Sequence, residues 1–377
     1  MPAKEIMLVV GEASGDAHGA RLVQALHRRN SQVKIYGVAG EQLRRSQFEE
    51  LFNVSQLTGM GLVELATNLR NVWRAYGLLK RTLKVRRPNL LILIDFPEFN
   101  LRLARFAKSL GIPVLYYVSP QIWAWRKNRV KQIARWVDHM AVIFPFEADF
   151  YERHGVKVSF VGHPLLETVK ADAGREETLA KFGLDPTRPV IALLPGSRHG
   201  EVTRHVPPMR EAAVQLARER NAQFFCVRAA TIDGAELHSL LNGTGVRIPI
   251  VENDRYGAVH ASDIAWTASG TATVEIALLG RPMIIMYRLS WLTYFIARWL
   301  VRVDHIGMVN LIAGERLMPE LIQRDVNPER IVAETRILLD DAKMRTGITD
   351  KLAKLRRRLG TPGAAERVAE LAFSIMR

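Results

Sequence analysis

The chain has 377 residues, and 48% of them are hydrophobic, so it is long enough to form two packed domains. Its 53 lysine and arginine residues outnumber 38 acidic residues, and residues 1–168 hold 24 of the basic and 14 of the acidic ones. This excess predicts an anionic partner for the N-terminal half, such as a phosphorylated substrate, an acidic membrane surface or a nucleic acid. A single cysteine, Cys226, excludes an intramolecular disulfide and any site built on several thiolates, which is typical of the reducing cytoplasm.

No segment has the pattern of an export signal or a membrane-spanning helix. Met1 leads directly into an apolar strand-like run, without the basic flank and long apolar stretch of a secretory peptide. The most apolar later segment, 283–303, is interrupted by three arginines. We therefore expect a soluble or peripheral protein.

Short β-branched segments alternate with helical patterns through the first half. The expected strands are 6–10, 34–38, 90–94, 114–118, 139–143 and 158–161. These runs are apolar on both faces, as in parallel strands that helices cover on both sides. The pattern predicts a doubly wound α/β domain over residues 1–168.

The alternation restarts after the polar stretch 171–178. The expected strands of the second half are 190–194, 223–227, 247–251, 264–267 and 282–286. We predict a second Rossmann-like domain over 169–350, followed by a C-terminal helical segment over 351–377. Ligands of such sheets bind beyond the carboxyl ends of the strands, so two facing domains would place the chemistry in a cleft between them.

Two turns of small residues each end a strand and open a helix in the second half. They read Leu-Pro-Gly-Ser-Arg at 194–198 and Thr-Ala-Ser-Gly-Thr-Ala at 267–272. Such turns direct backbone N–H groups and the positive end of a helix dipole at one point, so the pair predicts a diphosphate ligand. Arg198 would add positive charge. The alternative is that both turns are ordinary connections with Ser or Thr as helix N-caps.

Common nucleotide and metal signatures are missing from the sequence. It contains neither G-x-x-x-x-G-K-[ST] nor G-x-G-x-x-G, and it lacks H-E-x-x-H, an EF-hand loop and an Asp-x-Asp pair. The sequence therefore requires no metal ion and no cofactor.

Acidic residues follow two strands of the first domain. Asp95 ends the run 90–94, where a partly desolvated carboxylate could remove a proton from a hydroxyl, or could cap the helix that starts at Pro97. Glu12 and Asp16 lie around the Ser14-Gly15 pair after the first strand. They suit sugar hydroxyls, or they cap a helix that begins near residue 17.

Two further segments carry aromatic or apolar side chains beside basic ones. After the strand 114–118, Ser119, Trp123, Trp125 and Arg126 would contact a sugar ring and an acidic group, or would pack between domains. A second segment with helical spacing is followed by basic residues at 80–87. It is either a surface for an anionic bilayer or acyl chains, or the core face of an amphipathic helix. Its apolar members include Met60, Leu62, Val63, Leu69, Val72 and Trp73.

An ordered set of motifs resembles the lipid-A-disaccharide synthase family. The matching strings are VGEASGD at 10–16, GMGLVE at 59–64, YVSP at 117–120 with WAWR at 123–126, LPGSR at 194–198, ASGTA at 268–272 and NLIAG at 310–314. The resemblance implies a glycosyltransferase fold of the B type, in which the last helix crosses back to the first domain. It implies transfer of 2,3-diacylglucosamine from UDP to 2,3-diacylglucosamine 1-phosphate, with a β-1,6 linkage and release of UDP.

The resemblance also implies roles for individual residues. Asp95 matches the family's base, which would deprotonate the acceptor 6-hydroxyl. The residues in the nucleotide-side motifs are Gly196, Ser197, Arg198, Ser269, Gly270, Thr271, Ala272, Glu275 and Asn310. The first domain would bind the acceptor and the second the UDP-sugar. An α-linked donor and a β-linked product favour a single displacement with inversion.

The acyl chains of both substrates imply a cytoplasmic protein that associates peripherally with the inner membrane. The sequence leaves the oligomeric state open, a homodimer included. A UDP-sugar epimerase of the same architecture would share the nucleotide turns without needing an acyl surface. A basic nucleic-acid-binding protein would explain the net charge, but the basic residues are dispersed and no nucleic-acid motif is present, so we expect no nucleic-acid partner.

Overall fold

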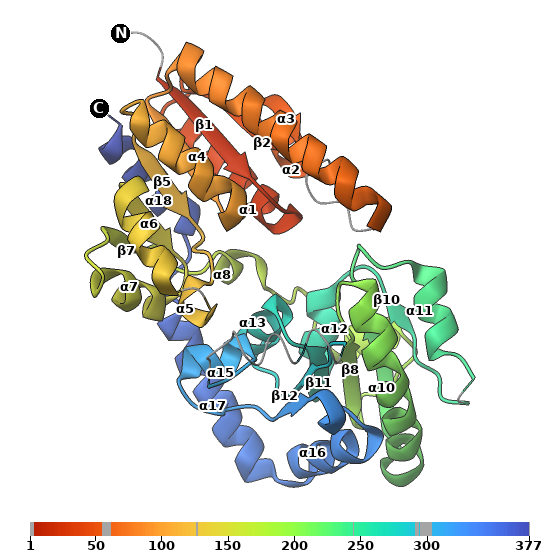
Figure 1. Cartoon of the computed structure of the whole chain (residues 1–377). Coiled ribbons are helices and arrows are strands. Elements are labelled where there is room, and N and C mark those ends of the chain that lie inside the picture. Colours follow the sequence, from red (N-terminus) through yellow and green to blue (C-terminus); the bar gives the residue numbers. More distant parts are fainter. Residues whose placement is uncertain are drawn as a thin grey trace. The chain divides into compact units, whose positions relative to one another are not determined.

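The computed structural model describes residues 4–54, 62–125, 127–243, 245–290, 294 and 304–376, and the side chains of Ala13 and of 62–69, 124, 125 and 127 are outside this description. The chain divides into two compact units. Unit 1 comprises Met1–Pro164 and Leu359–Arg377, and unit 2 comprises Leu165–Arg358. Each unit contains one parallel β-sheet with flanking helices (Figure 1).

Unit 1 is built on a seven-stranded parallel sheet in the order β3-β2-β1-β4-β5-β6-β7. Its strands are β1 (Glu5–Val10), β2 (Lys34–Ala39), β3 (Glu49–Asn53), β4 (Leu90–Ile94), β5 (Val114–Tyr117), β6 (His139–Val142) and β7 (Val158–Phe160). Its helices are α1 (Ala13–Arg29), α2 (Glu41–Arg44), α3 (Leu62–Arg86), α4 (Pro97–Ser109), α5 (Ile122–Trp125), α6 (Val130–Trp136), α7 (Pro145–Glu152) and α18 (Ala364–Ile375).

Unit 2 contains a six-stranded parallel sheet in the order β10-β9-β8-β11-β12-β13. Its strands are β8 (Val190–Leu194), β9 (Gln223–Val227), β10 (Ile250–Val251), β11 (Ile264–Ala268), β12 (Met283–Tyr287) and β13 (Glu320–Ile322). Its helices are α8 (Leu165–Thr168), α9 (Arg175–Lys181), α10 (His199–Arg220), α11 (Gly234–Leu241), α12 (Arg255–Ala261), α13 (Thr271–Leu278), α15 (Met308–Ala313), α16 (Pro328–Asp340) and α17 (Ala342–Arg358).

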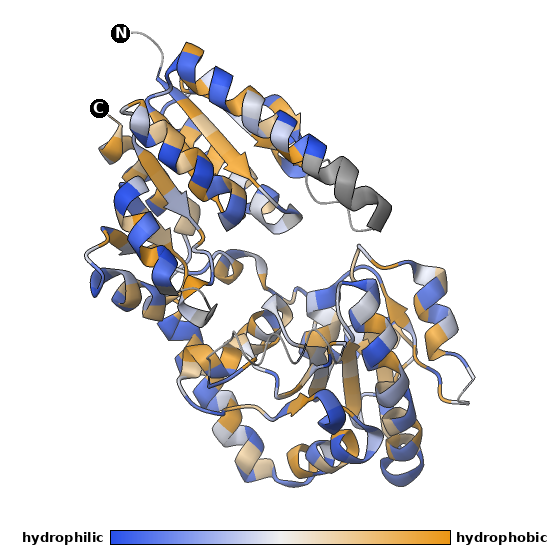
Figure 2. Cartoon of the chain, viewed as in Figure 1, coloured by the Kyte–Doolittle hydropathy of each residue, from blue (hydrophilic) through white to orange (hydrophobic). Residues whose placement is uncertain are grey.

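The central strands carry the hydrophobic core of each unit. Every residue of β4 is buried, as is every residue of β9 and β11. Figure 2 shows the strands of both sheets as mainly hydrophobic, whereas the surrounding helices alternate in hydropathy. This distribution is typical of parallel strands covered on both faces. The predicted α/β class and parallel sheets are therefore confirmed.

The chain returns to unit 1 at its end. α18 packs against α1, and its buried residues include Val368, Ala369 and Ala372 (Figure 1). Arg28 of α1 pairs with Glu366 of α18, and the Arg29 guanidinium lies 3.6 Å from the Glu370 carboxylate. The last helix is thus an integral layer of the first unit.

In each sheet, the strand order reverses between two neighbouring strands. In unit 1 they are β1 and β4, whose last residues, Val10 and Ile94, are register partners. In unit 2 they are β8 and β11, where Leu194 pairs with Thr267. Loops leave these strand pairs toward opposite faces of the sheet, so a crevice opens beyond their carboxyl ends and is the usual place for a ligand.

Candidate functional site: a nucleotide cavity and an acidic turn

A cavity of about 320 Å³ lies where the strand order of unit 2 reverses. The turn after β8 and the turn after β11 both line it. Predicted nucleotide-side residues in its wall are Gly196, Ser197, Arg198, Ser269, Gly270, Thr271, Ala272 and Glu275. The structure therefore brings together two turns that lie about seventy residues apart in the sequence, as parallel strand pairing requires.

The helices that follow the two predicted turns, α10 and α13, lack a side-chain cap. The N-cap of α10 is Arg198, whose side chain accepts no hydrogen bond from the helix, and the N-cap of α13 is Gly270, which has no side chain that could accept one. The alternative in which Ser or Thr caps these helices is therefore wrong. Uncapped N-termini leave backbone N–H groups and positive dipole ends for an anion.

Glycine is required at two positions of these turns. Gly196 has a φ of +132° and Gly270 a φ of +146°, which L-residues with side chains rarely adopt. A Cβ on Gly196 would lie 2.5 Å from Oε2 of Glu201 and 2.6 Å from its Cβ. The first turn is therefore closely packed against the side chain that follows it on α10.

The turn after β8 is held by three side chains. The Thr231 hydroxyl donates to the Ser197 carbonyl over 2.6 Å, and Nδ1 of buried His205 lies 2.8 Å from the Pro195 carbonyl. The Ser197 N–H donates to Oε2 of Glu201 over 3.0 Å. The side chain of Arg198 is 64% exposed at this turn.

Glu275 lies on the α13 side of the cavity with two neighbours that the sequence interpretation missed. Arg255 donates to its carboxylate over 2.6 Å, and the Tyr256 hydroxyl lies 3.3 Å from the same oxygen. Burial raises the pKa of Glu275, and the charge of Arg255 opposes that shift. Arg255 and Tyr256 both line the cavity, but they belong to α12, for which the sequence offered no motif.

Asn310 does not line this cavity. Its side-chain amide donates to the Met318 carbonyl over 2.9 Å and to Glu320 over 2.8 Å, and its side-chain oxygen accepts from the Met318 N–H over 2.8 Å. The residue is completely buried. Its hydrogen bonds hold α15 to the start of β13. In the structure, this predicted nucleotide-side residue therefore connects a helix to a strand.

Asp95 stands at the carboxyl end of β4 in a strained turn. Asp95 and Phe96 both have a φ of +50°, and such left-handed residues cost about 1–3 kcal/mol each when they are not glycine. The Asp95 carbonyl accepts hydrogen bonds from the side chains of Asn100 and Tyr116. A Cβ on Gly11 would lie 2.1 Å from the Cβ of Phe96, so glycine beside this turn allows it to pack closely on β1.

Burial and charge raise the pKa of Asp95. Desolvation is the larger cause, and the negative charge of Glu12 adds to it, whereas a hydrogen bond from the Phe96 backbone acts in the opposite direction. The N-cap of α4 is Phe96, so Asp95 does not occupy the N-cap position that the alternative assigned to it. The carboxyl group of Asp95 has the raised proton affinity that suits a general base.

The other acidic residues of this turn region differ in their surroundings. Glu12 and Ser14 are exposed at the start of α1, whereas Gly15 and Asp16 are buried. The Asp16 carboxylate accepts hydrogen bonds from the backbone N–H groups of Gly40, Gln42 and Leu43, over 2.7, 2.7 and 3.2 Å. Asp16 therefore holds the start of α2, and it does not cap its own helix, which begins at Ala13 and has Glu12 at its N-cap.

Ser119 and Trp123 belong to a buried hydrogen-bond network. The Trp123 indole N–H donates to Glu147 over 3.2 Å, and Ser119 Oγ lies 2.8 Å from the Tyr151 hydroxyl. Glu147 is 1% exposed, and burial raises its pKa to about 8. This network fixes the loop after β5 against α7. The Trp125 side chain and Arg126 lie outside the described residues.

The predicted membrane surface is partly described. Trp73 of α3 is 62% exposed and Val72 is half-buried, while Arg70 and Arg74 are exposed beside them. Met60 and the side chains of Leu62, Val63 and Leu69 lie outside the described residues. None of the described helices is long and apolar enough to span a bilayer.

Aromatic contacts lead from this surface toward Asp95. The ring of Trp73 lies 6.3 Å from that of Tyr76, Tyr76 lies 5.8 Å from Phe99, and Phe99 stacks on Phe96 at 5.4 Å between ring centroids. These rings connect α3 to α4 and to the residue that follows Asp95. The acidic turn and the exposed face of α3 are therefore one packed region.

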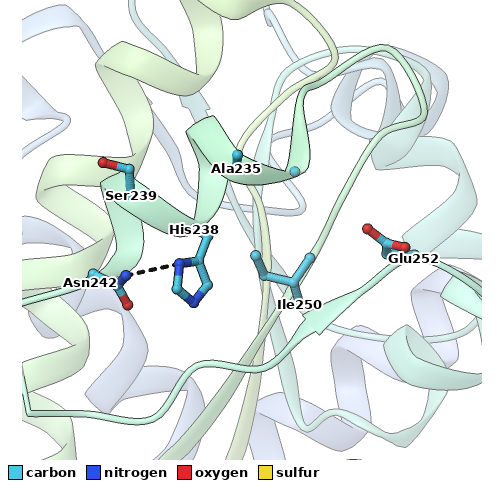
Figure 3. Close-up of a pocket in the computed structure, with 7 residues that line it drawn as sticks. Ala235, His238, Ser239, Asn242, Ile250 and Glu252 are labelled. Atoms are coloured by element: carbon cyan, nitrogen blue, oxygen red, sulfur yellow. Dashed lines mark hydrogen bonds between the residues drawn. The ribbon is translucent and has the colours of Figure 1, made fainter.

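A second pocket, of about 530 Å³, lies between α11 and β10 and is less suited to an anion (Figure 3). Its Asn242 and His238 are hydrogen-bonded to each other over 2.9 Å, and Glu252 adds a carboxylate on the opposite wall. The N-terminus of α11 is already capped, because the side chain of Asp233 accepts from the Glu236 N–H. The cavity between α10 and α13 therefore suits an anion better than this pocket does.

Comparison with known proteins decides the family. A family model described as lipid-A-disaccharide synthetase matches residues 6–372. The lipid-A-disaccharide synthase of Geobacter metallireducens is 45% identical over 377 residues, which cover 100% of this chain and 98% of that protein. The synthase of Syntrophus aciditrophicus is 46% identical over 381 residues, with 100% and 99% coverage.

The chain belongs to the lipid-A-disaccharide synthetase family. This membership confirms the family resemblance that the sequence motifs indicated. It favours glycosyl transfer over the epimerase and nucleic-acid interpretations. Within the described residues, no group of three His, Cys, Asp or Glu side chains is arranged to hold a metal ion.

Several solved structures share the fold of this chain although their sequence identity to it is low. A glycosyltransferase of kitacinnamycin aligns with a TM-score of 0.67 and 16% identity, covering 100% of both chains. The UDP-GlcNAc 2-epimerase from Neisseria meningitidis aligns equally well, with a TM-score of 0.67, 13% identity, and coverage of 98% of this chain and 100% of that one. Because glycosyltransferases and epimerases share this architecture, the fold alone does not separate them.

Proposed function

We propose that the protein transfers 2,3-diacylglucosamine from UDP to 2,3-diacylglucosamine 1-phosphate with inversion, giving a β-1,6 disaccharide and UDP. The observation that carries this proposal is the cavity of unit 2, where two uncapped helix N-termini and Arg198 meet beyond β8 and β11. A diphosphate fits such a site because its charge needs several donors at one place. Family membership supplies the sugar chemistry.

In the proposed reaction, Asp95 accepts the proton of the acceptor 6-hydroxyl. The oxygen of that hydroxyl forms a bond to C1 of the donor sugar, and the bond from C1 to the β-phosphate oxygen of UDP breaks. The raised pKa of Asp95 supports this role, because a base of higher proton affinity removes a hydroxyl proton more effectively. The strained turn, held by Asn100 and Tyr116, would keep the carboxylate in place.

The departing UDP gains negative charge as the C1–O bond breaks. The N-termini of α10 and α13 and the guanidinium of Arg198 would stabilise that charge. Glu275, which is held by Arg255, would accept hydrogen bonds from the hydroxyls of the nucleotide. Unit 2 would therefore bind the donor, and unit 1, with Asp95, Glu12 and Ser14, would bind the acceptor.

The acyl chains of both substrates require access to a membrane. We propose that α3 rests on the anionic inner membrane from the cytoplasmic side, with Trp73 inserted and Arg70 and Arg74 near the lipid phosphates. The aromatic rings from Trp73 to Phe96 would give an acyl chain an apolar surface that continues from the membrane toward Asp95.

The experiment is an assay of UDP release from UDP-2,3-diacylglucosamine by the purified protein in detergent, with and without acylated glucosamine 1-phosphate. We expect release only with the acceptor, together with a disaccharide whose anomeric proton is that of a β-linkage. A parallel assay with a chelator tests whether the helix N-termini and Arg198 stabilise the departing UDP without a metal ion. UDP release without acceptor would favour the epimerase chemistry, and no release would defeat the proposal.

A further inference from the structure

Glu201 occupies part of the position that the proposed diphosphate needs. Its carboxylate lines the cavity, accepts the Ser197 N–H over 3.0 Å, and lies 3.6 Å from the Arg198 guanidinium. A backbone N–H and an arginine are the two groups that a phosphate at this turn would use. The carboxylate of Glu201 contacts both of these groups.

Glu201 cannot easily leave this region. It is the third residue of α10, and its Cβ packs so closely on Gly196 that a Cβ on that glycine would lie 2.6 Å from it. Its side chain is 24% exposed. When a diphosphate binds, the carboxylate can rotate away from Ser197, but its negative charge stays at the turn.

The effect of this charge differs between the two nucleotides of the proposed reaction. In the donor, the β-phosphate is esterified to the sugar and carries a single negative charge. In UDP, the terminal phosphate has a second ionisation near pH 6, so it carries one more negative charge at neutral pH. A fixed carboxylate therefore repels the product more strongly than the donor.

We propose that Glu201 is a specificity-determining residue that weakens the binding of UDP relative to the UDP-sugar and so promotes product release. This inference rests on the proposed function of the cavity. A group that bound donor and product equally would change both affinities without changing their ratio. The ratio of the two affinities is therefore the quantity that Glu201 is expected to control.

The test uses the full-length protein and measures binding of UDP and of UDP-2,3-diacylglucosamine by calorimetry, without acceptor, at pH 7.5. Glu201→Gln keeps an oxygen that can accept the Ser197 N–H but removes the charge. We expect this variant to bind UDP roughly three- to tenfold more tightly, with a smaller change for the UDP-sugar. In turnover assays, its inhibition constant for UDP should fall by the same factor.

Two further variants separate charge at the turn from other effects. Glu219→Gln removes a charge that is 34% exposed and paired with Arg336 near the other end of α10, and neither residue lines the cavity, so the affinity ratio should stay at the wild-type value. Arg198→Ala should weaken both nucleotides. A structural role for Glu201 in shaping the turn predicts that Glu201→Gln weakens both ligands by one common factor, and that result would overturn the inference.

The outcomes also distinguish this inference from the proposed function. If the wild-type protein binds neither nucleotide, the proposed function fails and the inference fails with it. If the wild-type protein binds both and Glu201→Gln leaves their affinity ratio unchanged, only the inference fails.

Discussion

At the scale of single residues, Asp95 combines a strained backbone with an unfavourably placed charge. Its φ is positive, and both burial and the nearby Glu12 raise the pKa of its carboxyl group. A pKa above that of the unfolded chain means that folding stability is lost as the pH rises through the folded-state pKa. The charged form of Asp95 therefore costs stability at neutral pH, as is common for groups selected for activity.

Asp95→Asn should lower turnover by about 10²–10⁴-fold, because the variant keeps the shape of the side chain but removes the base. Asn tolerates the left-handed conformation, so the melting temperature at pH 7.5 should rise or stay unchanged. UDP affinity should stay near the wild-type value. Glu98→Gln, which changes an exposed carboxylate paired with Arg129, is the matched control. Wild-type turnover in Asp95→Asn would rule out the assignment of the base.

Glu147 should make folding stability depend on pH. Its pKa is raised from about 4.5 to about 8 by burial, so the folded protein holds one more proton than the unfolded chain between these values. Its contribution to stability is complete below pH 4.5 and is lost as the pH rises toward 8. Glu147→Gln should remove this decline, which thermal unfolding of both proteins from pH 5 to 9 would measure. Parallel curves would show that Glu147 does not titrate in this range.

Several residue assignments show why sequence motifs predict a site only in part. The two turns that line the cavity of unit 2 were predictable because each is local, a strand end followed directly by small residues. Asp16 and Asn310 belong to two other motifs, at 10–16 and 310–314, but their partners are backbone groups of Gly40 and Met318, which those motifs do not contain. The partnership of Glu147 with Trp123 joins residues in different helices, so no spacing rule could indicate it.

At the scale of secondary-structure elements, the central strands were predicted, whereas one edge strand of each sheet was missed. The central strands of both sheets are apolar runs that match the expected ranges closely. The edge strands β7 and β10 fall within expected ranges, but β3 was missed because its sequence is Glu-Glu-Leu-Phe-Asn, and β13 was missed because only three residues form it. Partly exposed edge strands tolerate charged residues, so they lack the apolar pattern of a buried strand.

The exposed face of α3 should determine membrane association. Trp73→Ser removes a side chain that is 62% exposed, and loss of its insertion should weaken binding to vesicles containing anionic lipid by about 1.5 kcal/mol, roughly tenfold. Ile337→Ser on α16, where the original side chain is 50% exposed, is the control and should leave vesicle binding unchanged. Sedimentation with vesicles would measure both. An equal loss of vesicle binding in the two variants would contradict a specific role for α3.

At the scale of the whole molecule, the two units should differ in their dependence on the C-terminus. Removing residues 359–377 deletes α18, whose buried residues include Val368 and Ala372, and exposes the face of α1 that it covers. Unit 1 should lose several kcal/mol of stability, whereas unit 2 retains its own core. The truncated protein should therefore show an early thermal transition and no turnover, yet still bind UDP. Loss of UDP binding would contradict the independence of unit 2.

The return of the chain to unit 1 also sets an order for folding during protein synthesis. Residues 1–164 leave the ribosome first, but the helix that completes their packing is made last, after all of unit 2. Until then, the α1 face that will receive Val368, Ala369 and Ala372 remains open to chaperones and to other nascent chains. Unit 2 is encoded without interruption, so it can finish folding while the earlier-made unit still waits for its final helix.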